Sequence, residues 1–363
     1  MARTFKVDRP FLLSLALLMA GGLVIFFSAS FGLLAKNQAE YSSIDFNQVV
    51  FGVLLGGIVC IITSRIPYKF WRQWAFWIFL ATVVLNLAIF IPGLGFTHGG
   101  SERWLNLGAY SLQPGEFLRI AALFYYAALL AMFKNKTATF QYGLLPLVVM
   151  ILGTELMFYV QGDTELVLPL ALTAMYIGGG GRWRDLGILF LIGAIGVTGL
   201  IMTKPYIKQR VYIFMHPASD PLGSGYQIQQ SLIAVGSGQI TGRGFGQSLQ
   251  KFNFLPEPVG DSIFAVAAEE FGFIGSMAIL ILYLLFGLFG LKIARRVGDP
   301  FGRLLTIGIV ILIVVQSYMN VGAMLGVIPL TGVTLVFVSH GGTSMLVSLF
   351  AAGIILNISR QRA

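Results

Sequence analysis

The residue best placed to do chemistry is Asp261, which ends a long polar stretch and precedes an apolar run. Pro256, Pro258 and Gly260 predict an extended approach to it. An aspartate at this point can cap the first free N–H groups of the following helix, or act as a general base at a membrane surface. Glu257 can raise the pKa of Asp261 as a neighbouring carboxylate, or lie in solvent as a loop residue. The spacing alone leaves both alternatives open.

Other ionisable residues lie inside or at the edge of apolar runs. Glu269 and Glu270 follow Asp261 within two or three helical turns, and burying such groups is costly unless they face a cavity or a partner. We expect one of them to pair with an arginine from another span. Glu116 and Arg119 stand three residues apart behind Pro114, so they are expected to pair with each other on one helix.

The polar stretch from about 204 to 262 also carries a set of cations among aromatic side chains. Arginine binds phosphate through two parallel hydrogen bonds, so such a set suits an anionic headgroup or a diphosphate. The alternative is that Lys and Tyr anchor the chain at the membrane interface. The cations of the stretch are Lys204, Lys208, Arg210, Arg243 and Lys251.

Several other chemistries are disfavoured by the residue pattern. The Gly-rich segment 236–246 is not followed by Lys-Ser or Lys-Thr, so we exclude a Walker-type ATP site. His98, His216 and His340 are far apart and show no metal-ligand spacing. The single Cys60 lies in an apolar run and provides neither a disulfide framework nor a thiolate site.

These residues must be positioned by helices that cross a membrane. The chain has 363 residues, of which 56% are hydrophobic and only 11% charged, whereas soluble domains carry about 25% charged residues. Runs long enough to cross roughly 30 Å of hydrocarbon predict an all-α polytopic membrane protein with about ten spans. The predicted spans are 11–34, 47–64, 74–92, 114–133, 141–158, 164–180, 186–203, 263–291, 303–320 and 341–358.

The distribution of the basic residues predicts the orientation. The net charge is +9, and most of the 24 Lys and Arg residues fall in alternate connections, which is typical of positive-inside topology rather than of nucleic-acid binding. We therefore expect both termini in the cytoplasm, one membrane domain over 1–363, and two outer loops. These loops are 93–113 and 204–261, the second lying between the seventh and eighth spans.

Motifs spread over nearly the whole chain resemble the SEDS family, the polytopic proteins FtsW, RodA and SpoVE of bacterial division, elongation and sporulation. Their occurrence in order is far more specific than any one of them. The form Pro-Val-Gly-Asp-Ser before the eighth span looks closer to FtsW than to RodA. The matching segments are Gly99 to Glu116, Pro217 to Ser231, Gly236 to Gly275, Asn320, Pro329 to Gly332, and Ser339 to Ser344.

The resemblance implies a ten-span fold and a peptidoglycan glycosyltransferase that polymerises lipid II at the outer face of the bacterial cytoplasmic membrane. Asp261 matches the family's catalytic aspartate, which would take the proton of the acceptor's sugar hydroxyl while undecaprenyl diphosphate leaves. No nucleotide is needed, because the donor is already activated. A divalent cation, Mg²⁺ or Mn²⁺, would screen the diphosphate, but the sequence shows no dedicated ligand cluster and leaves the need for one open. We expect further substrate contacts from Arg103, Glu116, Arg119, Arg210, Gln227, Lys251, Glu257 and Ser344.

The chain departs from the family pattern at several positions, none of which is Asp261. Arg119 stands where a lysine is common, and Gly115 where a serine is common. The segment around Asp163 lacks the usual proline before that residue, and Glu165 is unusual there. These departures weaken any role carried over to Asp163.

Two other functions compete with the glycosyltransferase: a flippase for the lipid-linked precursor, and a non-catalytic scaffold that activates a transpeptidase. A flippase would show charges or broken helices at the membrane midplane, whereas the polar groups here gather in the outer loop. The expected partners are lipid II, the growing glycan strand, a class B penicillin-binding protein and other membrane proteins of division or elongation.

Overall fold

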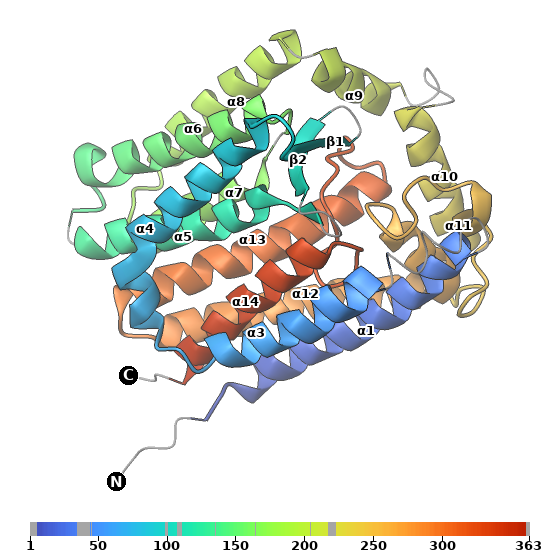
Figure 1. Cartoon of the computed structure of the whole chain (residues 1–363), viewed down its shortest axis with the longest axis horizontal. Helices are drawn as coiled ribbons and strands as arrows, with labels where there is room; N and C mark the ends of the chain where they lie inside the picture. The colour runs from blue at the N-terminus through green and yellow to red at the C-terminus, as the bar shows by residue number, and fades with distance from the viewer. Residues whose placement is uncertain are drawn as a thin grey trace.

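The computed structural model describes residues 6–34, 44, 46–98, 101–106, 111–134, 136–163, 165–203, 205–216 and 223–360. The described chain is nearly all helical, as expected, and its long helices run side by side in a bundle (Figure 1). The elements up to the middle of the chain are α1 (Arg9–Leu34), η1 (Asn47–Leu55), α3 (Gly56–Thr63), α4 (Tyr68–Leu87), η2 (Ala88–Phe90), β1 (Gly95–His98), β2 (Ser101–Asn106), β3 (Ser111–Leu112), α5 (Pro114–Met132), η3 (Phe140–Leu144) and α6 (Leu145–Val160). The remaining elements are α7 (Val167–Gly178), α8 (Asp185–Thr203), α9 (Pro205–Met215), α10 (Ser224–Ser237), α11 (Gln250–Asn253), α12 (Ile263–Arg296), α13 (Pro300–Met324) and α14 (Gly342–Ser359).

Eight helices of the described chain are long and apolar enough to cross a membrane. Two shorter apolar helices, Asn47–Thr63 and Val167–Gly178, stand where the second and sixth spans are predicted. Both ends of the chain lie at one end of the bundle, because the backbone N–H of Asp8 donates to Ser359 Oγ at 3.2 Å. That arrangement is the one expected for an even number of crossings.

Close contact between elements depends on small residues, as is usual for helices in lipid. A Cβ on Gly353 of α14 would lie 2.0 Å from Thr63 Oγ1 of α3, so no larger residue fits there. A Cβ on Gly22, in the middle of α1, would lie 2.2 Å from the carbonyl oxygen of Phe337. The connection between α13 and α14 therefore dips well into the bundle from the end opposite Asp8 and Ser359. That end carries the two predicted outer loops and is called the outer end after that prediction.

Helix α12 is broken near its start, at Gly272, where φ is 64° and ψ is −162°. Two contacts with α13 show that the chain turns back at this point. Asn320 donates to the carbonyl of Asp261 at 2.8 Å, and Tyr318, two residues earlier, donates to that of Leu280 at 2.9 Å. Asp261 and Leu280 thus lie at a similar height along α13. An outward arm, 263–271, and an inward arm, 273–296, form what we call the α12 hairpin.

The segment before the hairpin satisfies the backbone groups freed by the break. The N–H groups of Phe273 and Ile274 donate to the carbonyls of Gln239 and Ile240 at 2.9 and 3.1 Å. In return, the carbonyl of Glu269 accepts from the N–H of Arg243 at 3.0 Å. The predicted uninterrupted span 263–291 is therefore wrong at its beginning, because a glycine and an exchange of backbone hydrogen bonds permit a turn there.

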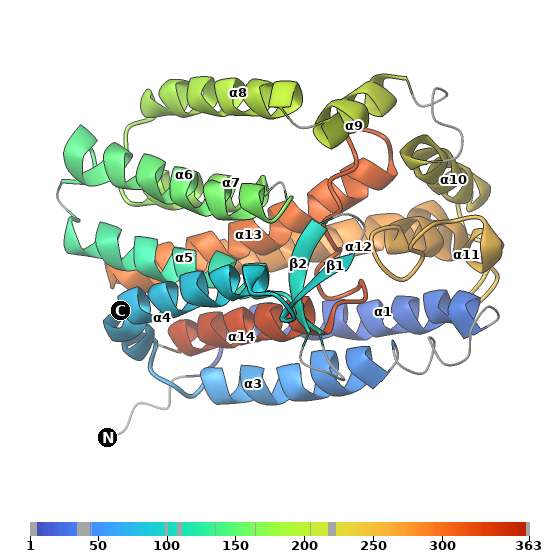
Figure 2. The same cartoon turned by 45° about the horizontal axis from the view of Figure 1, so that its top comes forward.

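The predicted outer loop 204–261 contains helices rather than irregular chain alone. Helices α9, α10 and α11 lie together at the outer end of the bundle in Figures 1 and 2. Ile228 and Ala234 of α10 are buried, whereas Leu232 and Ile233 are exposed. Apolar residues on both sides of a short helix hide the period that would have predicted it. Lys204 lies outside the described residues.

The other predicted outer loop, 93–113, folds into a small antiparallel sheet of order β1-β2-β3. Gly95 pairs with Leu105, and Leu105 with Leu112. Strands this short leave almost no alternating pattern in a sequence. The sheet lies at the outer end, beside the start of α5 (Figure 2).

Candidate functional site

Asp261 lies at the foot of the outward arm and is half-buried. Helix α12 begins after Ser262, and no side-chain hydrogen bond caps it. Of the two roles open to Asp261 from the sequence, the helix cap is therefore not the one found. Its carboxylate instead faces the charged groups of neighbouring elements.

The backbone around Asp261 is held by residues of α13 and of the connection 325–341. Asn320 Nδ2 donates to the carbonyls of both Asp261 and Val333, at 2.8 Å each. Ser339 Oγ donates to the carbonyl of Gly260 at 2.9 Å, and the N–H of His340 to that of Val259 at 2.7 Å. Three hydrogen bonds thus hold the segment 259–261 that presents Asp261, and the bond to Val333 holds Asn320 itself in place.

Arg210 of α9 is brought to Asp261 across a gap bounded by Gly332. A Cβ built on Gly332 would lie 3.7 Å from Asp261 Oδ2 and 3.8 Å from an Arg210 guanidinium nitrogen. Gly332 has a φ of 70°, a conformation that other residues adopt at a cost. Arg210 is oriented by a hydrogen bond of 3.2 Å to the carbonyl of Leu330. A carboxylate and a guanidinium therefore face one small space left open by a glycine.

The pKa of Asp261 is raised to about 6, chiefly by burial and next by the nearby Glu257 carboxylate. Arg210 and Arg103 act in the opposite direction, since a cation favours the ionised form. A carboxyl group with this pKa is mostly ionised near pH 7 yet accepts a proton more readily than an exposed aspartate. Such a balance suits a general base.

Arg103 and Asp163 are two further charged residues near Asp261, on the side of the small sheet. Arg103, on β2, pairs with Asp163, in the turn between α6 and α7, at 3.0 Å. Asp163 also raises the pKa of Asp261, although less than Glu257 does. Gln227, on α10, donates to Ser262 Oγ at 3.0 Å and so lies next to Asp261 in the chain. The predicted candidates Arg103, Arg210, Gln227 and Glu257 all gather here.

Glu116 and Arg119 form the local pair that their spacing predicts, at 2.9 Å. Arg119 also pairs with Glu165, from the turn before α7, a partner that its spacing to Glu116 does not predict. Glu165 in turn accepts from the N–H groups of Val167 and Leu168 at 2.9 and 3.1 Å, and so caps α7. This buried group joins the outer ends of α5 and α7 and lies next to the Arg103–Asp163 pair in the chain. Its signal in the sequence was the unusual position of Glu165 just before an apolar run.

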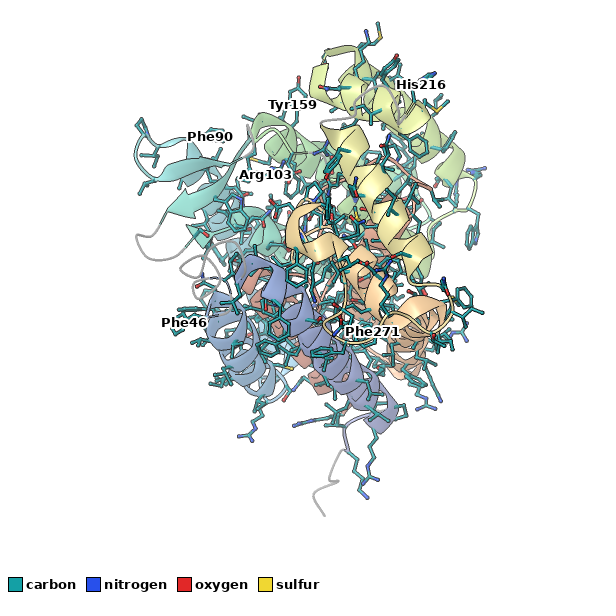
Figure 3. All side chains as sticks on the ribbon, turned by 90° about the vertical axis from the view of Figure 1, so that its right-hand side faces the viewer. Phe46, Phe90, Arg103, Tyr159, His216 and Phe271 are labelled. Carbon is teal, nitrogen blue, oxygen red and sulfur yellow. The ribbon has the colours of Figure 1, made fainter. Side chains whose placement is uncertain are left out.

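Two predicted candidates lie elsewhere. Lys251 is fully buried, and its Nζ lies 2.7 Å from Glu270 Oε1. Lys251, a predicted substrate contact, is thus placed beside a buried carboxylate and not in the group around Asp261. Ser344 is buried in the first turn of α14, close to Gly341. Figure 3, which looks onto the outer end, shows Arg103 and Phe271 of the hairpin well apart.

Glu269 and Glu270 are paired with cations, as expected for buried carboxylates, although the partners differ from those predicted. An arginine from another span was expected for one of them, whereas Lys251 and Arg243 come from the segment between α10 and α12. Among the described residues, no group of three or more His, Cys, Asp or Glu side chains could hold a metal ion.

The fold and the site define a class: a polytopic helical membrane protein with an ionisable aspartate beneath its outer rim. The chain matches the family model described as "Cell cycle protein", the FtsW/RodA/SpoVE family, over residues 8–363. The protein belongs to this family.

Relatives and solved structures agree with that assignment over almost the full chain. Stage V sporulation protein E of Bacillus subtilis is 36% identical, covering 95% of this chain and 94% of the relative. A probable peptidoglycan glycosyltransferase FtsW of Geobacter metallireducens is 35% identical, covering 98% and 95%.

Among solved structures, RodA of Thermus thermophilus has a TM-score of 0.69 at 22% identity, with 98% of each chain covered. A chain of a peptidoglycan synthase complex, described as coordinating polymerization and crosslinking, reaches 0.78 at 24% identity with the same coverage. These likenesses show the fold.

Proposed function

We propose that the protein is a peptidoglycan glycosyltransferase that polymerises lipid II at the outer face of the bacterial cytoplasmic membrane. The observation that carries the proposal is the position of Asp261, half-buried beneath the outer rim with Arg210 across a gap lined by Gly332. Relatives that are 35% identical over nearly the whole chain are named as probable enzymes of this kind.

In the proposed reaction Asp261 acts as a general base. Its carboxylate takes the proton from the acceptor sugar's hydroxyl as that oxygen attacks the anomeric carbon of the donor. The bond from this carbon to the diphosphate oxygen breaks, and undecaprenyl diphosphate leaves with the electron pair. Arg210 is suited to balance the negative charge of the leaving diphosphate, because a guanidinium offers several donors to phosphate oxygens.

The arrangement of charges supports a polymerase more than a flippase. Glu116 and Arg119 lie in the first turns of α5, and Glu165 lies just before α7. Glu270 contacts Ser28 near the outer end of α1, so the break in α12 also lies toward that end. A path through the membrane would need such groups at its middle, whereas these gather at one end.

The partner that we propose is a class B penicillin-binding protein, which would crosslink the new strands. The support is the likeness to a chain from a complex described as coordinating polymerization and crosslinking. The bundle would then supply the polymerase, and the partner the transpeptidase.

The proposal is tested with the purified full chain in lipid nanodiscs, supplied with lipid II and no other polymerase. We expect glycan strands from the natural chain and at least a 100-fold lower rate from Asp261→Asn, which keeps the shape but cannot act as a base. A parallel flipping assay in vesicles should show no difference between the two proteins. Full polymerisation by Asp261→Asn would overturn the assignment, and lost flipping would favour the flippase.

A further inference from the structure

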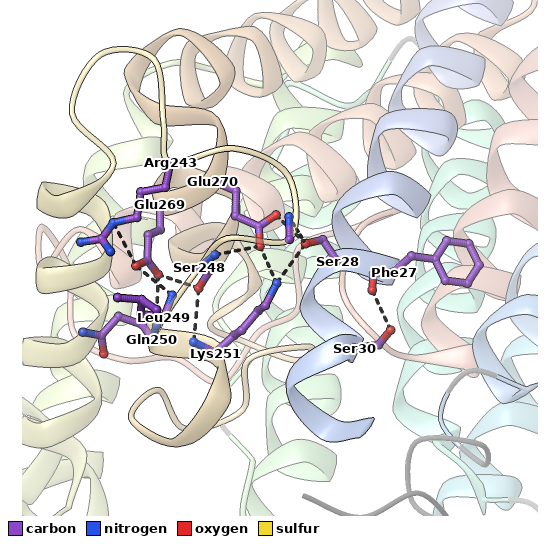
Figure 4. Close-up of polar contacts among 11 residues, drawn as sticks. Phe27, Ser28, Ser30, Arg243, Ser248, Leu249, Gln250, Lys251, Glu269 and Glu270 are labelled. Carbon is purple, nitrogen blue, oxygen red and sulfur yellow. Dashed lines mark hydrogen bonds and ion pairs between the residues drawn. The ribbon is translucent and has the colours of Figure 1, made fainter. Parts of the chain in front are cut away.

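A buried charged cluster lies away from Asp261, at the other end of the outward arm. Lys251, Glu270 and Ser28 come from three separate elements, and each side chain is no more than 1% exposed. Lys251 Nζ lies 2.7 Å from Glu270 Oε1 and 3.2 Å from Ser28 Oγ, and Ser28 Oγ donates to Glu270 Oε2 at 2.5 Å. Figure 4 shows this cluster between α1 and the hairpin.

The neighbouring Glu269 ties down the same short segment, 248–251. It accepts from Ser248 Oγ at 2.6 Å and from the N–H groups of Leu249 and Gln250 at 3.1 and 3.3 Å. Arg243 Nε lies 3.5 Å from Glu269 Oε1. Two adjacent carboxylates at the tip of the arm thus hold the segment around α11, as Figure 4 also shows.

Buried ion pairs seldom add much to stability, because desolvation offsets their attraction. Their effect on geometry is clearer. Separating the two charges would leave each of them buried and unpaired at a high free-energy cost, so the pair restricts how the two elements can be arranged. The cluster joins the outer end of α1 to the tip of the outward arm. That arm is a short helix that is buried from Ile263 to Glu270 and begins two residues after Asp261.

We propose that Lys251 and Glu270 are positioning residues, a clasp that fixes the outward arm against α1 and so sets the height of Asp261 beneath the outer rim. The proposal rests on the proposed function of Asp261. A helix of nine residues is about 13 Å long and rigid on this scale, so movement at its tip is carried to its foot. The hinge for such movement is Gly272, whose φ of 64° makes it the one break within α12.

A first test measures the arm's position without any activity assay. Spin labels are attached at Ile240→Cys and Val327→Cys, which are both about two-thirds exposed, in a Cys60→Ala background. The carbonyl of Ile240 accepts from Ile274 just after the break, and the N–H groups of Arg243 and Gly244 donate to Glu269 and Glu270 of the outward arm. Val327 follows α13. We expect one narrow distance in the parent, a broad distribution in Lys251→Met and in Glu270→Gln, and a narrow one again in the double variant. In the double variant, neither charge is left unpaired.

A second test compares lipid II polymerisation by the same variants. Each single variant should lose about 10- to 100-fold in rate, because a displacement of a catalytic group by about 1 Å has an effect of that size. The double variant should recover at least tenfold of that loss. The pH at which the rate is half-maximal should fall in the single variants, because a displaced Asp261 is better hydrated. The groups facing Asp261 that set this pH are Glu257, Arg210, Arg103 and Asp163, and none of them is altered.

The control is Arg72→Gln, which removes a half-exposed cation paired with Asp299 at the opposite end of the bundle. It should change neither the distance nor the pH profile. Unchanged distance distributions in the single variants would overturn the clasp while leaving the proposed function intact. So would single variants that merely unfold more easily, with the parent's pH profile. Inactivity of the parent chain would instead contradict the proposed function, and the distance measurement would still decide the clasp.

Discussion

At the scale of single residues, the chemistry depends on the charges that surround one carboxylate. Asp261 is half-buried, and its pKa of about 6 results from burial and Glu257 against Arg210 and Arg103. Only Glu257, four residues before Asp261, is close to it in the sequence. The balance is therefore a property of the fold, although each residue can be removed separately.

Two neutralising substitutions should move the pH profile of polymerisation in opposite directions. Glu257→Gln removes a negative charge, so the pKa of Asp261 should fall and the rising limb should move to lower pH. Arg210→Gln removes a positive charge, so the limb should move to higher pH, each by about one unit or less. Rates measured from pH 5 to 8 check this, and shifts of the same sign would contradict it.

How far the sequence predicts these residues is clearest from Asp261 and Lys251. Family motifs identify Asp261, but local spacing alone cannot distinguish a base from a helix cap, since both lie before an apolar run. Lys251 stands in a polar, basic segment and so resembles a headgroup ligand, whereas its partner Glu270 is distant in space until the hairpin forms. Pairings across the fold, such as Arg119 with Glu165, leave no trace in local patterns.

At the scale of elements, the connection 325–341 matters as much as the helices. It dips into the bundle as far as Gly22 of α1 and carries the groups that hold the Asp261 peptide. Its sequence, with Pro329 and three glycines between two predicted spans, is consistent with a connection but does not predict its path. The same holds for the α12 hairpin, because an apolar run with one glycine reads as a single span.

Gly332→Ala tests whether the gap between Asp261 and Arg210 is needed. The new methyl group would lie 3.7 Å from Asp261 Oδ2, in the space where the acceptor hydroxyl must approach, so we expect at least a tenfold loss of rate. The matched control is Gly326→Ala, which has a similar φ of 65° but faces Ile228 and Leu232. Both should lose about 1 kcal/mol of stability from backbone strain, measured by thermal unfolding. Equal activities of the two variants would contradict the account.

At the scale of the whole molecule, hydropathy is a reliable guide, since length and apolarity are properties of contiguous residues. Every predicted span has an apolar helix at its place, even where the helix is short, as at Val167–Gly178. The orientation relies on the positive-inside rule. Helix pairing depends instead on close contacts such as Gly353 with Thr63, which no span prediction contains.

The orientation is checked by labelling intact cells with a membrane-impermeant maleimide, in a Cys60→Ala background. Val327 and Trp183 are both exposed and lie at opposite ends of the bundle. We expect Val327→Cys to react in intact cells and Trp183→Cys to react only after the cells are opened. The reverse pattern would place Asp261 on the cytoplasmic side and exclude polymerisation at the outer face.

The most direct test of the central claim, that Asp261 is the base for glycosyl transfer, is the polymerisation rate against pH for the natural chain. A base with a pKa of about 6 must be ionised to act, so the rate should be constant above pH 7. It should fall about tenfold for each pH unit well below 6, while circular dichroism shows the chain still folded. A rate that stays constant down to pH 5 would contradict the account.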